Sequence, residues 1–247
     1  MKSNSSRYLC GLVAGLLSLT VVAAQAAGPY SGTGASRSGD MPNAVDATYM
    51  IDDGTAEDSI GLTAGGSFIS LNSFQVTGGL NMITDIQIAW GTPAFPDPSL
   101  NGLPYVAYLW SGTGPSPSSG ATLLGSVPGV ISSAGTNTFL TSTFATPINV
   151  GANGAWFFVG FAITHNAGQF PAAFDETSPI SNRSYINLGG DPNNLSGAAP
   201  IESFGLVGNW LIRADATAVP EPSSWAMIGL GGALLIGFMR FRARRLS

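Results

Sequence analysis

Four carboxylates stand close together near the start of the central part of this chain. Asp52, Asp53, Glu57 and Asp58 fall within seven residues around Gly54. Oxygen ligands at this density suit Ca²⁺, which takes about six to eight of them at about 2.4 Å. The spacing does not match an EF-hand, and the alternative is a solvated acidic turn in which Asp53-Gly54 supplies the backbone geometry. The sequence leaves both interpretations open, so calcium is the one cofactor that we consider.

A second set of polar side chains follows later, where Asp175 and Glu176 precede Arg183. A glycosidase needs two carboxyls that converge about 5–10 Å apart, whereas adjacent residues of an extended chain point in opposite directions. Asp175 and Glu176 are therefore not expected to form that pair. Pairing of Arg183 with one of them would pin the segment, and ligand binding and catalysis are the alternatives.

Trp110 precedes a Gly/Ser/Pro loop, and we expect its ring to be partly exposed for sugar stacking, although core burial is the simpler interpretation of every aromatic ring.

Several kinds of site are disfavoured by the residues that the chain lacks. His165 is the only histidine, which excludes a multi-histidine metal site. No Gly-x-Ser-x-Gly elbow is present, so we interpret His165 as a hydrogen-bonded residue at a strand end and not as part of a hydrolase triad. Cys10 is the only cysteine and lies in the predicted signal peptide, so the mature chain has no thiol. No catalytic residue is predicted, and we expect a protein that is not an enzyme.

Charge is scarce between the two ends of the chain. Residues 27–218 contain three arginines, no lysine and thirteen carboxylates. Nucleic acid is excluded as a partner, because phosphate binding needs clustered Lys or Arg. An acidic surface of this kind repels polyanions and attracts cations.

Short apolar segments separated by Gly, Pro, Asn and Ser turns fill residues 44–218, and they predict strands. The candidate strands are Thr48–Ile51, Phe68–Val76, Met82–Trp90, Tyr105–Trp110, Thr122–Val127, Thr138–Phe144, Ala155–Thr164, Ser184–Leu188 and Asn209–Ala216. Residues 156–163 are apolar on both faces, which favours a central strand. Residues 165–184 are predicted as a long irregular loop, and Arg213 and Asp215 are spaced for a surface ion pair. We expect an all-β, jelly-roll-like sandwich of about eight to ten strands.

The N-terminus has the pattern of a secretory signal peptide. Lys2 and Arg7 give a basic region, Leu9–Ala24 an apolar region, and Ala24-Gln25-Ala26 a small-x-small cleavage site. We place the signal peptide at residues 1–26, to be used by the Sec translocon and cut by signal peptidase. Residues 27–43 are rich in Gly and Ser and are predicted to be a flexible leader.

The C-terminal tail, residues 219–247, combines three features in a fixed order. Val219-Pro220-Glu221-Pro222 is followed by the uncharged run Trp225–Met239, and the basic end, 240–245, carries Arg240, Arg242, Arg244 and Arg245. As a helix the apolar run spans about 22 Å, which makes it a thin transmembrane segment for a hydrocarbon core of about 30 Å. The arginines are expected to stay cytoplasmic, with the domain on the other side of the inner membrane.

This tail resembles the PEP-CTERM sorting signal of Gram-negative bacteria. The resemblance implies an exosortase as partner, cleavage near Pro220-Glu221-Pro222, and delivery from the inner membrane to the cell surface or extracellular matrix, commonly in organisms that produce exopolysaccharide. More weakly, Asp-Asp-Gly-Thr-Ala-Glu at 52–57 resembles the start of secreted bacterial β-sandwich modules of unassigned chemistry. We expect a non-enzymatic structural or adhesive domain. The alternatives are a carbohydrate-binding module for exopolysaccharide, assisted or not by Ca²⁺, and a polysaccharide-active hydrolase.

The tail is predicted to be a sorting signal and not a permanent anchor. Mass spectrometry of the native surface-exposed protein should therefore detect no peptide beyond about residue 222. Recovery of intact 225–247 from that material would contradict the prediction.

Overall fold

The structure, a computed structural model, describes residues 46–218. Within this range the chain forms strands, turns and short 3-10 helices, and no α-helix. None of the helices between residues 46 and 218 is long and apolar enough to cross a membrane. The predicted signal peptide, the predicted leader and the predicted transmembrane segment 225–239 lie outside the described residues.

The described residues form thirteen strands and three 3-10 helices. They are β1 (Asp46–Tyr49), β2 (Asp58–Ile60), β3 (Gly66–Gln75), β4 (Met82–Ile88), η1 (Pro98–Leu100), β5 (Pro104–Gly112), η2 (Pro117–Ser119), β6 (Ala121–Val130), β7 (Leu140–Asn149), β8 (Trp156–His165), β9 (Ala172–Asp175), β10 (Ser184–Leu188), β11 (Ala199–Pro200), η3 (Ile201–Phe204), β12 (Asn209–Trp210) and β13 (Ile212–Thr217).

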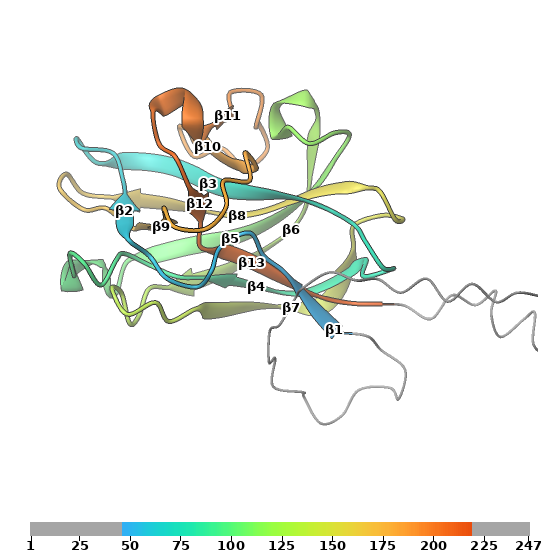
Figure 1. Cartoon of the computed structure of the whole chain (residues 1–247), viewed down its shortest axis with the longest axis horizontal. Helices are drawn as coiled ribbons and strands as arrows, with labels where there is room; N and C mark the ends of the chain where they lie inside the picture. Colours follow the sequence, from blue (N-terminus) through green and yellow to red (C-terminus); the bar gives the residue numbers. More distant parts are fainter. Residues whose placement is uncertain (1–45, 219–247) are drawn as a thin grey trace, which may run out of the picture. The chain divides into compact units, whose positions relative to one another are not determined.

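Two large antiparallel sheets contain most of these strands (Figure 1). One has the order β1-β13-β4-β7, and the other has the order β11-β10-β3-β8-β5-β6. Consecutive long strands often change sheet, as β3 and β4 do and as β7 and β8 do, so the two sheets interleave along the chain. This arrangement agrees with the predicted all-β sandwich, and its jelly-roll-like character stays a prediction. A small third sheet, β12-β9-β2, completes the fold.

The inner faces of the two large sheets share one hydrophobic cluster. It includes Phe157, Val159 and Phe161 of β8 and, from the opposite sheet, Ile86 and Ile212. Residues two apart on a strand share a face, so the odd-numbered residues of β8 fill this core. Trp90 and Trp210, which alternate with apolar neighbours in the sequence, are buried in the same cluster as predicted.

The outer face of β8 is covered by a second, smaller cluster. Phe158 packs there with Trp110, Tyr185, Leu195 and Ala198, the last two from the segment between β10 and β11. Both Phe158 and Phe161 are fully or almost fully buried, on opposite faces of one strand. The central position predicted for this strand is confirmed, since β8 pairs with β3 on one side and with β5 on the other.

The long loop predicted for residues 165–184 contains strand β9, all of whose residues are buried. β9 pairs with β2 and β12, and Phe174 of β9 packs edge-to-face against Trp210 with 5.2 Å between ring centroids. The strand has four residues and no alternation of polar and apolar side chains, so periodicity gave no signal for it. The irregular-loop prediction is therefore wrong for 172–175.

Truncating Phe158 tests how far the domain depends on the covered outer face of β8. Phe158→Ala should lower the free energy of unfolding by about 3–5 kcal/mol, through lost burial and the cavity left behind. Phe170→Ala removes a side chain that is 38% exposed and should cost much less. Chemical denaturation of both variants measures the difference. Equal losses, or a larger loss for Phe170→Ala, would show that the core is placed wrongly.

Candidate functional site

The fold brings the acidic turn and the second polar segment together. β2, which begins at Asp58, pairs with β9, and Asp58 lies opposite Phe174. The backbone N–H of Glu57 donates to the carbonyl of Phe174 at 3.0 Å, which extends the pairing by one residue. Asp175 and Glu176 follow directly, so the two sets of carboxylates that lie more than a hundred residues apart in sequence become neighbours.

Asp175 is the centre of this junction, and its side chain is fully buried. Its Oδ2 accepts a hydrogen bond from the backbone N–H of Asp53 at 2.9 Å. Its Oδ1 accepts from the backbone N–H groups of Thr177 and Ser178, each at 2.9 Å. A buried carboxylate needs such donors, because an unpaired charge in the interior is costly. Asp175 therefore holds the acidic turn and its own loop in one geometry.

Two further carboxylates close the junction from the acidic turn. Asp53 Oδ1 accepts from the backbone N–H of Thr55 at 2.9 Å, and Asp53 Oδ2 accepts from the hydroxyl of Thr177 at 3.2 Å. Glu57 Oε2 accepts from the backbone N–H of Glu176 at 3.0 Å. We call Asp52, Asp53, Glu57 and Asp175 the acidic clamp, because each of them joins segments that are distant in the chain.

The fourth member of the clamp, Asp52, binds a cation from the opposite end of the domain sequence. Arg213 Nη2 lies 2.5 Å and Nε 3.0 Å from Asp52 Oδ1, and the guanidinium also lies over the ring of Phe139, 4.1 Å from its centroid. Gly54 has φ of +94°, and a Cβ there would meet Arg213 Nη2 at 3.1 Å. The predicted surface pairing of Arg213 with Asp215 is wrong. Arg213 reaches across to the acidic turn because Asp52 is buried and needs a counter-charge.

The two buried carboxylates of the clamp have pKa values shifted in opposite directions. Burial raises the pKa of Asp52 above its ordinary value, against the opposing hydrogen bond and charge of Arg213. Burial acts in the same sense on Asp175, but hydrogen bonds from Ser178, Asp53 and Thr177 outweigh it and lower the pKa of Asp175. Asp175 is thus the carboxylate whose ionised form the fold stabilises.

These contacts bear on the calcium interpretation of Asp52, Asp53, Glu57 and Asp58. Among residues 46–218, no group of three or more acidic, histidine or cysteine side chains is arranged to hold a metal ion. Asp58 Oδ1 accepts from the backbone N–H of Ser59 at 2.7 Å, and the other three carboxylates serve the clamp. The structure therefore gathers part of the predicted set, together with Asp175, but in a hydrogen-bonded arrangement.

The other predicted binding residues are dispersed. Trp110 is fully buried and donates its Nε1 hydrogen to the carbonyl of Pro192 at 2.8 Å, so the exposure predicted for it is wrong. The segment between β10 and β11 covers the ring, and local sequence around Trp110 gives no sign of that cover. Arg183 does not pin the loop through Asp175 or Glu176, because its guanidinium lies over Trp156, 5.3 Å from the ring centroid. Glu176 has an exposed side chain.

His165 is hydrogen-bonded at the end of β8, as the sequence predicts. Its Nε2 accepts from the backbone N–H of Leu62 at 3.1 Å, and its Nδ1 lies 2.9 Å from the carbonyl oxygen of Asn166. The carbonyl can only accept, so Nδ1 carries the proton and Nε2 is the acceptor. Both ring nitrogens are engaged with backbone, and the ring is buried.

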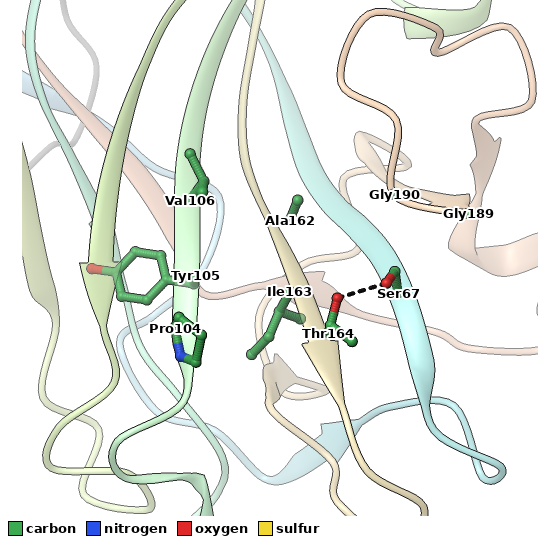
Figure 2. Close-up of a pocket in the computed structure, with 9 residues that line it drawn as sticks. All are labelled: Ser67, Pro104, Tyr105, Val106, Ala162, Ile163, Thr164, Gly189 and Gly190. Carbon is green, nitrogen blue, oxygen red and sulfur yellow. Dashed lines mark hydrogen bonds between the residues drawn. The ribbon is translucent and has the colours of Figure 1, made fainter.

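A shallow groove of about 290 Å³ lies on the outer face of the six-stranded sheet (Figure 2). Ser67 of β3, Val106 of β5, and Ala162 and Thr164 of β8 contribute side chains to it, and the Gly189-Gly190 turn forms one wall. The hydroxyls of Ser67 and Thr164 lie 2.6 Å apart and point toward one another across the two strands (Figure 2). Sequence analysis missed this groove, because it is assembled from one or two small residues on each of three strands.

Comparison with known proteins assigns the C-terminal part of the chain. The PEP-CTERM protein-sorting motif matches residues 218–245. The chain carries a PEP-CTERM sorting signal. This motif marks an exported protein that is made as a membrane-anchored precursor and processed by an exosortase on its way to the cell surface. The body that precedes the PEP-CTERM tail is a β-rich fold of unassigned function.

No curated protein matches this sequence. Among solved structures, the cysteine protease and lectin-like domains of Cwp84, a surface-layer-associated protein of Clostridium difficile, align over 73% of this chain and 37% of that one, with 13% identity and a TM-score of 0.48. A variant of the clostridial cysteine protease Cwp84 after propeptide cleavage aligns over 70% and 40%, with 14% identity and a TM-score of 0.49. The chain thus spans about two fifths of these structures, and the likeness assigns no ligand or activity to it.

Replacing Asp175 tests the clamp and its pH dependence. Asp175→Asn should lower the free energy of unfolding by about 1–3 kcal/mol at pH 7, because the amide NH₂ group then faces backbone N–H donors from which it cannot accept. Since the fold lowers the pKa of Asp175, its contribution is present above the ordinary value of about 3.9 and is lost as the pH falls through the lowered value. The difference in the free energy of unfolding between variant and wild type, measured by urea denaturation, should therefore become smaller below about pH 4.

Glu176→Gln is the matched control, because Glu176 is adjacent in the chain and its side chain is exposed. At pH 3 and at pH 7, this variant should have a free energy of unfolding within about 0.5 kcal/mol of the wild-type value. A destabilisation by Asp175→Asn that is the same at pH 3 and pH 7 would contradict the role given to the ionised carboxylate.

Proposed function

We propose that the β-sandwich is a non-enzymatic structural or adhesive domain, which the PEP-CTERM signal delivers to the cell surface or the extracellular matrix. The proposal rests on the contacts that the carboxylates of the acidic clamp make within the fold. The side chains that best fit acid–base chemistry are engaged in holding segments together. Asp175 accepts three backbone hydrogen bonds, and Asp52 is paired with Arg213.

The geometry of the clamp is unlike that of a hydrolase site. A general acid or base must be within hydrogen-bond reach of a substrate, in a space that the substrate can enter. Asp175 is fully buried and Asp52 is 4% exposed, so neither carboxylate faces such a space. His165, the residue that a serine hydrolase would need, has both ring nitrogens occupied by backbone groups. These contacts favour a structural role over a polysaccharide-active hydrolase.

A carbohydrate-binding function for exopolysaccharide is the second candidate, and the groove on the outer sheet face favours it. Val106 and Ala162 offer an apolar floor, and the hydroxyls of Ser67 and Thr164 offer hydrogen-bonding groups beside it. A pyranose presents the same combination, with an apolar ring face and a rim of hydroxyls. The groove contains no carboxylate among the described residues that line it, so calcium would have to assist sugar binding from elsewhere on the domain.

A glycan array probed with the purified domain separates the two candidates. The structural proposal expects no glycan above background, with or without EDTA, and no release of reducing sugar from exopolysaccharide. The carbohydrate-binding candidate is favoured if the wild-type domain binds a glycan and Ala162→Glu abolishes this binding, because a carboxylate in the groove floor would block a sugar ring. Ala94→Glu, at an exposed position in the turn after β4, is the matched control. Release of reducing sugar would overturn the non-enzymatic proposal.

A further inference from the structure

The last strand of the folded body runs directly into the sorting signal. Thr217, the final residue of β13, is paired with Asp46 of β1 and with Met82 of β4. The PEP-CTERM motif begins at residue 218, so no linker separates the sheet from the motif. Any enzyme that binds the Pro-Glu-Pro segment at 220–222 meets the folded sheet within a few residues.

Chain length limits how far the body can move away from the membrane in the precursor. Seven residues, 218–224, separate Thr217 from Trp225, where the apolar run begins, so the chain makes eight residue-to-residue steps between them. Fully extended, they span at most about 28 Å. A folded domain of about 170 residues has a radius of gyration of about 16 Å, so its diameter exceeds this tether. With residues 225–239 in the membrane, as the sequence predicts, a tether of this length would keep the end of the sheet that contains Thr217 toward the membrane while the precursor is processed.

Two loops surround this end of the sandwich. Met82 pairs with Asn149 of β7, and the loops 76–81 and 150–155 then connect this sheet to β3 and β8. They are tied together: the N–H of Gly79 donates to Asn153 Oδ1 at 2.8 Å, and the N–H of Val150 donates to the carbonyl of Asn81 at 2.9 Å. We call these two loops the tail-side end.

The tail-side end carries no charge of its own. Neither loop contains an acidic or basic residue, although residues 27–218 carry thirteen carboxylates. Asp46, opposite Thr217, belongs to the edge strand β1 and lies outside both loops. Thr77 and Ala152 are exposed in the loops. The guanidinium of Arg183 lies over Trp156, the residue that follows loop 150–155, so the uncharged surface is that of the two loops themselves. Loops without charge beside an unspaced cleavage motif are suited to close contact with another protein, because none of their side chains carries a charge that has to lose its hydration.

We propose that the tail-side end is a docking surface for the processing exosortase, so that the enzyme binds the folded body together with the PEP-CTERM segment. This inference rests on the proposed export of the folded sandwich through its sorting signal. It adds that recognition extends beyond the linear motif to the loops 76–81 and 150–155. The body then contributes to the rate of its own processing.

Charge placed on the tail-side end tests the proposal in the full-length precursor. Ala152→Glu and, independently, Thr77→Glu put a carboxylate at an exposed loop position. Each should slow conversion of precursor to processed protein by about tenfold in a pulse–chase experiment in the exporting bacterium, the effect of a partly desolvated charge. Ala94→Glu, also exposed, is the control, because it follows the far end of β4 from Met82. It should be processed at the wild-type rate.

A spacer distinguishes docking from other effects of charge. About twelve Gly/Ser residues inserted between Thr217 and Ala218 add about 20 Å of reach and leave the motif at 218–245 intact. With the spacer, Ala152→Glu and Thr77→Glu should be processed as fast as the spaced wild type. Equal melting temperatures of the purified variants would show that folding is unchanged.

The remaining outcomes are decisive in the other direction. The docking surface is overturned if both loop variants are processed at the wild-type rate. It is also overturned if the Ala94→Glu control is slow, or if the spacer fails to restore the rate of a slow loop variant. None of these results affects the proposed function. Loss of the effect in detergent-solubilised membranes that retain processing would assign the contact to lipid headgroups and would also overturn the docking surface. A wild-type precursor that is never processed would instead overturn the proposed function, and the inference with it.

Discussion

Strand β8 is apolar on both faces, and the rest of the fold depends on covering both of them. Burial of large side chains is the dominant favourable term in folding, at roughly 25 cal/mol per Å² of apolar surface. Phe157 and Phe161 require the opposing sheet, and Phe158 requires a second cover from the segment that contains Leu195 and Ala198. The opposing sheet of the sandwich covers Phe157 and Phe161, and the segment between β10 and β11 covers Phe158.

A second constraint comes from the scarcity of cations. Arg213 is the one arginine that the described residues pair with a carboxylate, through Asp52. Asp175 is buried without a cation, so its charge has to be satisfied by backbone N–H groups. That requirement fixes the path of residues 175–178 and ties the acidic turn to β9. The acidic clamp thus follows from burying carboxylates in a chain with few cations to offer.

The parts of the fold that sequence analysis predicted are those in which local pattern and tertiary environment agree. The central strand at 156–163, the strand Ser184–Leu188 and the buried Trp90 and Trp210 each follow from the order of nearby side chains. The failures concern contacts made across the fold. Strand β9 is too short for periodicity, the cover over Trp110 comes from a segment some eighty residues away, and the choice of Asp52 over Asp215 by Arg213 depends on burial.

The same distinction separates the sorting signal from the groove on the outer sheet face. A sorting signal is a linear motif, read from consecutive residues, so the order of Pro-Glu-Pro, apolar run and arginines was sufficient to identify it. The groove is built from Ser67 of β3, Val106 of β5, and Ala162 and Thr164 of β8, which have ordinary neighbours in sequence. The distance between the sorting signal and the folded sheet needs both kinds of information. The linear motif gives its own first residue, and the structure shows that the sheet ends at Thr217, directly before it.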